Sequence, residues 1–282
     1  MICFPNAKIN LGLQVIAKRA DGYHNINTVF YPIPLCDILE IIPASDGITV
    51  FSSTGLNIPG DPASNLCRKA YQLLSDSFLT PDSILQSAKL LPPVKIHLHK
   101  VIPMGAGLGG GSSDGAHTLL LLNDLFELGL SHEALQDLAR RLGSDCPFFI
   151  DNKPVFAFEK GDRFQSIKLN LEGYSLVVVA PDIHCDTTAA YTGIDPREPE
   201  IQLTEIVGRS VEQWNTVLVN DFEKTIFKKF PAIEDIKKQL YELGAVYVSM
   251  SGSGAALYGF FKVTPSLKGL FPGCFVWESS AI

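Results

Sequence analysis

The residues best suited to chemistry form a glycine-rich stretch near the middle of the chain. Positions 103–116 read Pro-Met-Gly-Ala-Gly-Leu-Gly-Gly-Gly-Ser-Ser-Asp-Gly-Ala. Glycine lacks a Cβ and tolerates positive φ, so such a backbone can turn tightly and present its N–H groups to a ligand. The stretch leads into a helix-forming segment, whose unpaired amides and dipole attract anions. The pattern therefore predicts a phosphate-binding loop made of Pro103, Met104, Gly105, Ala106, Gly107, Leu108, Gly109, Gly110, Gly111, Ser112 and Ser113.

Other phosphate-binding patterns fit this loop only formally. Gly105, Gly107 and Gly110 satisfy G-x-G-x-x-G, but a dinucleotide-binding fold also needs an acidic residue after a second strand, about 20 residues on. Asp124 lies near that distance, inside a helical pattern. The Gly-Lys-Ser/Thr of a Walker A loop and the His-Arg-Asp and Asp-Phe-Gly motifs of protein kinases do not occur. A flexible linker is the plain alternative, although a linker is not normally followed at once by an apolar helix.

A second candidate pair, Lys8 and Asn10, lies near the start of the chain. Residues 8–15 alternate between polar and apolar side chains, which predicts a half-buried strand. Lys8 and Asn10 would project together from its polar face, away from the core. Simple solvation is the usual fate of a lysine, so this segment alone leaves the role of Lys8 open. His97 and His99 share a face of another predicted strand, but with no third ligand nearby we favour ordinary strand side chains over a metal site.

Several elements must position the loop. The patterns predict two strands within 38–51, a helix over 64–78 and a strand over 94–101 that leads into the loop. After the loop, Ser112, Ser113 and Asp114 are candidate N-caps of a helix that ends near Gly129. Another helix would begin at Ser131 and stop at Gly143, and a turn over 144–147 would then carry Asp145.

The second half of the chain has a different pattern of predicted strands and helices. Strand patterns are followed by two helical patterns and then, over residues 246–259, by a strand, a tight glycine loop and another strand. The earlier strands are expected at 155–158, 164–169 and 176–180, and the helices at 211–230 and 232–243. Strands and helices mix without strict β-α-β alternation, which predicts an α+β fold in two lobes. We place the boundary so that the domains are 1–160 and 161–282.

Composition excludes several classes of protein. The 282 residues are 46% hydrophobic and 19% charged, as in an ordinary well-packed globular protein, and the net charge of −7 disfavours a nucleic-acid or acidic-membrane surface. The six cysteines are scattered without a C-x-x-C pair, which argues against a zinc site and a disulfide framework. No signal peptide and no apolar run of membrane-spanning length is evident, so we expect a cytoplasmic protein.

Three separate motifs match one family together. Pro5-Asn-Ala-Lys-Ile-Asn-Leu-Gly12, residues 103–116 and Ser249-Met-Ser-Gly-Ser-Gly-Ala255 resemble the three signature motifs of the GHMP kinases. The resemblance runs nearly end to end. Two departures are Gly115, where alanine is more usual, and Glu159-Lys-Gly-Asp162, which replaces a more glycine-rich segment. Neither touches a residue to which we assign chemistry.

Further segments resemble one branch of this family, which phosphorylates a cytidine-diphosphate-linked polyol. They are Asp21-Gly-Tyr-His24, Leu142-Gly-Ser-Asp-Cys-Pro-Phe-Phe149 and Asn220-Asp-Phe-Glu223. The resemblance implies an N-terminal lobe like ribosomal protein S5 and a ferredoxin-like C-terminal lobe. It also implies an enzyme that uses ATP to phosphorylate the 2-hydroxyl of this small molecule, in non-mevalonate isoprenoid precursor synthesis. Mg²⁺ would accompany the ATP, and we nominate no protein ligand for it; no obligate protein partner is evident.

The resemblance also implies roles for individual side chains in phosphoryl transfer, where positioning and charge stabilisation carry most of the catalysis. Asp145 would accept the proton of the substrate hydroxyl as general base. Lys8 would lie beside it and stabilise negative charge, and Asn10 would orient the substrate.

The remaining roles concern the cytosine ring of the substrate. By resemblance Tyr23 stacks on the ring and His24 hydrogen-bonds its edge. Thr187 and Tyr191 belong to one short segment that would complete the substrate site, with Tyr191 as the opposing aromatic side chain. Two alternatives stay open: a GHMP kinase for another small alcohol, such as homoserine or mevalonate, and a dinucleotide-dependent oxidoreductase resting on G-x-G-x-x-G alone.

Overall fold

The computed structural model describes residues 1–77 and 91–280. Contacts between residues divide the chain into two units, each assembled from several segments. The first unit contains residues 1–7, 35–104 and 110–152, and the second contains residues 8–34, 105–109 and the chain from 153 onward. The two units therefore interleave along the sequence, and a single boundary at residue 160 stays a prediction.

The first unit is built on a four-stranded sheet. Its strands lie in the order β1 (Ile2–Cys3), β4 (Ile38–Pro43), β6 (Val94–Lys100) and β5 (Val50–Gly55). β5 pairs parallel with β6, whereas the other neighbours are antiparallel. Along β6, Val94, Ile96 and Leu98 are buried and alternate with more exposed residues, as expected for a sheet with one face against the core.

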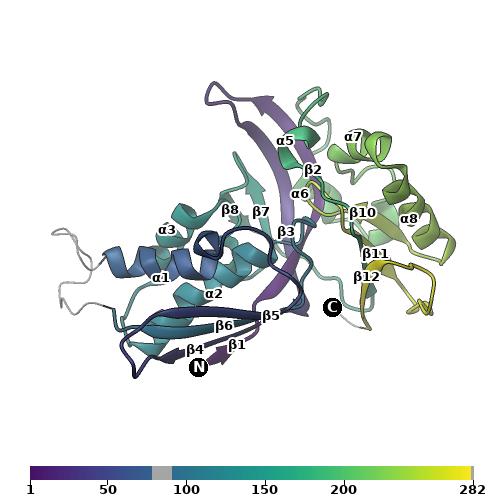
Figure 1. The fold of residues 1–282 in the computed structure, drawn as a ribbon. Helices are drawn as coiled ribbons and strands as arrows, with labels where there is room; N and C mark the ends of the chain where they lie inside the picture. Colours follow the sequence, from purple (N-terminus) through teal and green to yellow (C-terminus); the bar gives the residue numbers. More distant parts are fainter. Residues whose placement is uncertain (78–90, 281–282) are drawn as a thin grey trace. The chain divides into compact units, whose positions relative to one another are not determined.

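Helices cover one face of this sheet (Figure 1). They are η1 (Pro62–Ser64), α1 (Leu66–Ser77), α2 (Gly110–Leu125), α3 (His132–Leu142) and α4 (Phe148–Asp151). Position 78, the last residue of the helix predicted from the sequence, lies outside the described residues. A Cβ on Gly115 of α2 would lie 3.0 Å from the Cβ of Leu66 on α1. Glycine at this position thus permits the close approach of the two helices.

The second unit contains a sheet built from a long hairpin. Its strands lie in the order β2 (Asn6–Lys18), β3 (His24–Cys36), β7 (Val155–Phe158) and β8 (Arg163–Ser166). The sequence predicted a half-buried first strand, and this was wrong. Lys8 and Asn10 on the polar face of β2 are only 3% and 2% exposed. The alternation of polar and apolar residues thus belongs to a strand that is buried on both faces. The polar side chains Lys8 and Asn10 form hydrogen bonds within the protein.

A second, fully antiparallel sheet follows in the order β10 (Tyr247–Met250), β11 (Leu257–Phe261), β9 (Ser175–Pro181) and β12 (Cys274–Ser279). Helices α7 (Phe222–Lys229) and α8 (Pro231–Glu242) connect β9 to β10 and lie against this sheet (Figure 1). β11 lies between β9 and β10, which is the split β-α-β arrangement of ferredoxin-like folds. The predicted α+β fold with a ferredoxin-like C-terminal lobe is confirmed.

The long helix predicted over 211–230 is interrupted. The structure has a single turn, η2 (Val211–Gln213), and then α7; the earlier α5 (Thr187–Ala190) and α6 (Leu203–Val207) are also short. Between η2 and α7 the backbone pairs with β2, because Leu13 N–H donates to Val219 O and Asp221 N–H donates to Leu13 O, both at 2.9 Å. These inter-strand hydrogen bonds replace the helical ones that apolar periodicity suggested.

Candidate active site

The glycine loop alternates buried apolar anchors with glycines. Ala106 and Leu108 are buried, whereas Gly105, Gly107 and Gly109 have φ of 65°, 80° and 71°, in the left-handed region that favours glycine. Immediately afterwards α2 begins at Gly110. The first N–H groups of a helix have no intrahelical partner, so the loop ends at a group of free donors. This geometry fits the predicted phosphate-binding role of residues 103–113.

The helix begins earlier than the sequence predicted. Ser112, Ser113 and Asp114 lie inside α2 and are not its N-caps, because the glycines at 110 and 111 already adopt the helical conformation. Ser113 is fully buried, with its Oγ 3.3 Å from Nδ1 of His117 one turn later. Ser112 is half-buried at the first turn. Of the two predicted hydroxyl donors, Ser112 is therefore the more accessible.

Asp114 belongs to a buried cluster of charges that joins the two ends of the loop. The Lys100 ammonium donates to Asp37 and lies 2.8 Å from Asp114 Oδ2. Asp37 Oδ1 also accepts the N–H groups of Val101 and Ile102, at 2.6 and 2.9 Å, where the chain enters the loop. Burial, reinforced by the negative charge of Asp37 and partly offset by Lys100, raises the pKa of Asp114 to about 7.

Lys8 and Asn10 lie together on β2. The Lys8 Nζ donates to Asn10 Oδ1 at 2.6 Å and lies 4.7 Å from the centre of the Phe30 ring. Asn10 Nδ2 donates to Thr28 Oγ1 at 3.0 Å, which in turn donates to the carbonyl of Gly12 at 2.6 Å. The side-chain amide of Asn10 is thus held with its oxygen toward Lys8. The structure brings these two predicted residues together.

Ser251 links the three glycine- or polar-rich motifs, and sequence reasoning gave it no role. Its fully buried hydroxyl donates to the carbonyl of Gly107 at 2.8 Å and accepts the backbone N–H of Asn10 at 3.2 Å. Two backbone hydrogen bonds support the same arrangement: Lys8 N–H to Leu108 O at 2.9 Å and Ala256 N–H to Ala106 O at 3.1 Å. The signal available in the sequence was a serine within the glycine- and serine-rich third motif.

The predicted base-binding residues are only partly brought together. The rings of His24 and Tyr191 stack, with centroids 4.4 Å apart and planes 11° apart. Tyr23 is 63% exposed, and the Lys160 ammonium lies 5.2 Å from its ring centre. Burial and the positive charge of Lys18 lower the pKa of His24. The imidazole is therefore neutral at pH 7, with one nitrogen as donor and the other as acceptor.

Two predicted residues lie elsewhere. Thr187 begins α5, and its Oγ1 is 3.0 Å from Oγ of Ser253 in the third motif. Asp145 lies half-buried in the turn between α3 and α4, where the sequence placed it. Asp145 belongs to the first unit and Lys8 to the second, so their predicted pairing stays a prediction. Asp124 lies within α2 and not after a strand, which removes the structural basis of the dinucleotide alternative.

The described residues contain no group of three or more His, Cys, Asp or Glu side chains that could hold a metal ion. His97 and His99 instead bond to Ser52 and Thr54 on the neighbouring strand β5. Within the same described ranges, no helix has the length and apolar character needed to cross a membrane.

Comparisons with known proteins agree with this geometry. The family description "GHMP kinases N terminal domain" matches residues 65–153, and "GHMP kinases C terminal" matches residues 204–266. A protein of Cytophaga hutchinsonii, named 4-diphosphocytidyl-2-C-methyl-D-erythritol kinase, is 51% identical over 266 residues, which cover 94% of each chain. A protein of the same name from Bacteroides fragilis is 51% identical over 264 residues, covering 93% of this chain and 92% of that protein.

Solved structures show the same fold. A crystal structure of 4-(cytidine 5'-diphospho)-2C-methyl-D-erythritol kinase has a TM-score of 0.81 at 30% identity, covering 99% of this chain and 98% of that chain. Mevalonate kinase of Methanococcus jannaschii has a TM-score of 0.64 at 15% identity, covering 99% and 97%, and shares the fold alone. The chain therefore belongs to the GHMP kinase family, within the group of 4-diphosphocytidyl-2-C-methyl-D-erythritol kinases.

Proposed function

We propose that the protein transfers the γ-phosphoryl group of ATP to the 2-hydroxyl of 4-diphosphocytidyl-2-C-methyl-D-erythritol. The observation that carries this proposal is the meeting of three motifs at Ser251, whose hydroxyl joins Asn10 on β2 to Gly107 in the glycine loop. One buried side chain thereby fixes the candidate phosphate loop against the strand that carries Lys8. Relatives of nearly the same length that bear this kinase's name support the choice of substrate.

The glycine loop and the start of α2 bind the ATP phosphates in this proposal. Their amide groups are donors without helical partners, and the helix dipole favours negative charge at the same end. Gly111 offers room there, because a Cβ on it would meet no described atom within 4 Å apart from its chain neighbours and the backbone of its own helix. The Ser112 hydroxyl adds a donor in the first turn of the helix.

Lys8 and Asp145 act on the hydroxyl that is phosphorylated. Asp145 accepts its proton as the new bond to phosphorus forms, and the Lys8 ammonium stabilises the negative charge that develops on the oxygen. Asn10 holds that ammonium through its Oδ1, at 2.6 Å. We therefore extend the predicted substrate-orienting role of Asn10: it also orients Lys8.

The cytosine ring is recognised by the aromatic residues at the base of the β2–β3 turn and on α5. A neutral His24 offers one donor and one acceptor to the edge of the ring, and Tyr23 and Tyr191 offer flat faces. Thr187 binds the same substrate from α5. These assignments rest on the resemblance of Asp21-Gly-Tyr-His24 to the family pattern and on the position of Tyr191 next to His24.

Magnesium arrives with the nucleotide in this proposal. Mg²⁺ is usually held by substrate phosphates with one or two carboxylates, and a dedicated protein cage is uncommon. When bound, the ion neutralises charge on the phosphates.

The proposal is tested by measuring ADP release with a panel of alcohols. We expect turnover with the cytidine-diphosphate-linked substrate and a kcat/KM at least about a hundredfold lower with mevalonate and homoserine, because neither carries a cytosine ring for His24 to read. Equal or better turnover with either of the other alcohols would assign the protein to a different substrate within its family.

A further inference from the structure

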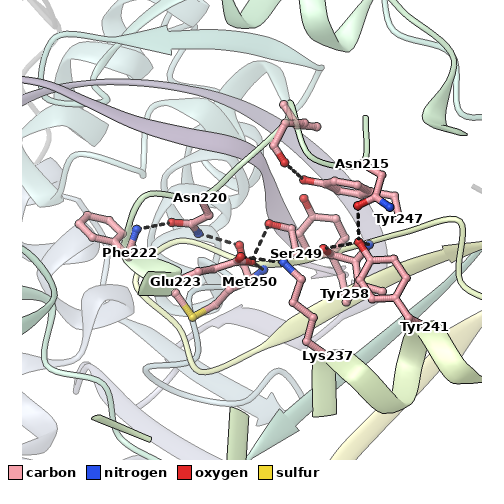
Figure 2. Close-up of polar contacts among 12 residues, drawn as sticks. Asn215, Asn220, Phe222, Glu223, Lys237, Tyr241, Tyr247, Ser249, Met250 and Tyr258 are labelled. Atoms are coloured by element: carbon pink, nitrogen blue, oxygen red, sulfur yellow. Dashed lines mark hydrogen bonds and ion pairs between the residues drawn. The ribbon is translucent and has the colours of Figure 1, made fainter. Parts of the chain in front are cut away.

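The segment Val219–Glu223 is connected to both the strand and the third motif of the candidate site. It lies beside β2 through the two backbone hydrogen bonds of Leu13, and a third bond runs from Val15 N–H to Asp221 Oδ2 at 2.7 Å. The mechanism proposed above gives this segment no role. Its two remaining polar side chains, Asn220 and Glu223, form hydrogen bonds to Met250 of the third motif (Figure 2).

Asn220 holds two carbonyl groups at once. Its side chain is buried, at 3% exposed, and Nδ2 donates to Met250 O and to Gly252 O, both at 2.8 Å. Its Oδ1 accepts the N–H of Phe222 at 3.0 Å. Every polar atom of this amide is therefore used, and the two carbonyls it fixes lie on either side of Ser251.

Glu223 binds the backbone N–H of Met250, the residue whose carbonyl Asn220 binds. Its Oε1 accepts the N–H of Met250 at 2.8 Å and the hydroxyl of Ser249 at 3.1 Å, and its Oε2 pairs with the Lys237 ammonium of α8 at 2.7 Å (Figure 2). The carboxylate side chain is only 13% exposed. Asn220 and Glu223 thus hold the carbonyl and the amide of Met250 from one short segment.

Met250 is linked to the phosphate loop through one residue, Ser251. The next residue is Ser251, which bonds to Gly107 and Asn10, and a Cβ on Gly107 would lie 1.9 Å from the Ser251 carbonyl oxygen. Because packed interiors do not deform freely, a shift of the backbone at Ser251 shifts the backbone at Gly107, and the reverse. A displacement of Met250 therefore moves the glycine loop.

We propose that Asn220 and Glu223 are positioning residues for phosphoryl transfer, which act through Met250 and Ser251 on the phosphate loop and on the strand that carries Lys8. This inference rests on the proposed function, because it assumes that the loop binds ATP. Neither side chain touches the reacting atoms in this account. A misplacement of about 1 Å at a reacting group can lower the rate about a hundredfold, which makes a positioning role measurable.

The main test compares Glu223→Ala with Tyr241→Phe. The Tyr241 hydroxyl accepts the N–H of Val248 at 3.2 Å. Removing this hydroxyl should also weaken the support of β10, but at a position two residues before Met250. We expect Glu223→Ala to lower kcat roughly 10- to 100-fold and to weaken binding of the ATP analogue adenylyl imidodiphosphate. We expect Tyr241→Phe to lower the melting temperature and leave both quantities near the wild-type values.

If Glu223→Ala does not fold, more conservative variants still test the positioning role. Glu223→Gln keeps an oxygen that can accept from Met250, so it should recover most of kcat while losing the ion pair with Lys237. Asn220→Asp keeps the acceptor for Phe222 but replaces two donors by an oxygen facing two carbonyls, so it should lower kcat as Glu223→Ala does. Lys237→Gln removes the ion pair and the contact of the ammonium with the Phe227 ring, but it keeps the bonds of Glu223 to Met250 and Ser249, so it should reduce stability without changing kcat.

Two outcomes separate this inference from the proposed function. If the wild-type protein binds the ATP analogue but does not phosphorylate the cytidyl substrate, the proposed function is wrong and the binding comparison among variants still decides the positioning role. If folded Glu223→Ala and Asn220→Asp bind the analogue and turn over like Tyr241→Phe at a matched loss of melting temperature, the two residues serve stability alone and the inference is overturned.

Discussion

The Lys8 Nζ lies 2.6 Å from Asn10 Oδ1, on the same face of one strand, and both side chains are almost completely buried. A buried ammonium is costly unless it is hydrogen-bonded or paired. The hydrogen bond to Asn10 offsets part of this cost on the strand that Ser251 joins to the glycine loop. In the proposed reaction this ammonium would stabilise the negative charge that develops during phosphoryl transfer.

We expect Lys8 and Asp145 to act as one unit. Lys8→Ala and Asp145→Ala should each lower kcat by roughly 10²–10⁴-fold, with a smaller effect on KM. Because residues that act together are not additive, the double variant should be little worse than the poorer single one. Steady-state kinetics of the four proteins make the comparison. Near-normal kcat in either single variant would show that the two charges are unrelated to the chemical step.

The phosphate loop is tested most cleanly at Gly111. Apart from its chain neighbours and the backbone of its own helix, a Cβ there meets no described atom within 4 Å, and valine is no worse than glycine in a helix, so Gly111→Val should fold with unchanged stability. If the amides of α2 receive phosphate, the added methyl groups should weaken ATP binding roughly tenfold or more. Titration of ATP and a melting curve give both quantities. ATP affinity equal to that of the wild type would remove the start of α2 from the phosphate site.

Gly107 is a poorer test of the same loop, although the sequence pointed to it equally. Its φ is 80°, and a side chain would collide with the Ser251 carbonyl oxygen at 1.9 Å. Gly107→Val should therefore lose both stability and ATP binding. A loss of binding without any fall in melting temperature would contradict the contact described between these two loops.

His24 should decide the affinity for the cytidyl substrate. His24→Ala removes the stacking on Tyr191 and the polar ring edge, so KM for this substrate should rise by roughly tenfold or more, while KM for ATP changes little. Tyr191→Phe keeps the ring and serves as the matched control, with near-normal constants. Equal increases in both KM values for His24→Ala would make the histidine a structural residue.

The buried Asp114 predicts a pH dependence of stability. Its pKa is about 7 in the folded protein against an ordinary value of 3.8, so between these pH values the folded state binds a proton that the unfolded state has lost. The corresponding stabilisation is complete below about pH 4, falls as pH rises, by at most about 1.4 kcal/mol per pH unit, and is lost above about pH 7.

Asp114→Asn isolates this effect, because asparagine does not titrate. Urea unfolding at pH 5, 6, 7 and 8.5 should show the variant gaining stability relative to the wild type up to about pH 7 and then a constant difference. A difference that is the same at all four pH values would mean that Asp114 is already ionised throughout this range.

Patterns in the sequence were sufficient for elements whose signals are local. The cap at Ser131 is formed, with its Oγ 3.3 Å from the N–H of Ala134, and β7 has the predicted bounds. Local patterns failed where long-range contacts decide. Periodicity alone predicted that Lys8 and Asn10 face solvent. Both are buried, because Lys8 donates to Asn10 and Asn10 in turn donates to Thr28.

The candidate site was predictable in its motifs and less so in its supports. The glycine loop, Lys8, Asn10 and the aromatic candidates Tyr23, His24 and Tyr191 follow from residue types and family resemblance, whereas the stacking of His24 on Tyr191 was not predicted. Ser251, Asn220 and Glu223 could not be assigned from the sequence, because their partners lie far away along the chain: Ser251 binds Asn10, and Glu223 binds Met250. The helix predicted over 211–230 is interrupted before residue 222 for the same reason. The backbone at Val219 and Asp221 forms hydrogen bonds with Leu13 of β2, which is distant in the sequence.

The most direct measurement is the phosphorus-31 NMR spectrum of the product formed from ATP and the cytidine-diphosphate-linked methylerythritol. Carbon 2 of that polyol carries a methyl group and no hydrogen. Transfer to its hydroxyl should therefore give a new phosphomonoester signal without the three-bond proton coupling that a primary or secondary alcohol produces. A proton-coupled phosphomonoester, or no new signal while ATP remains intact, would contradict the proposed reaction.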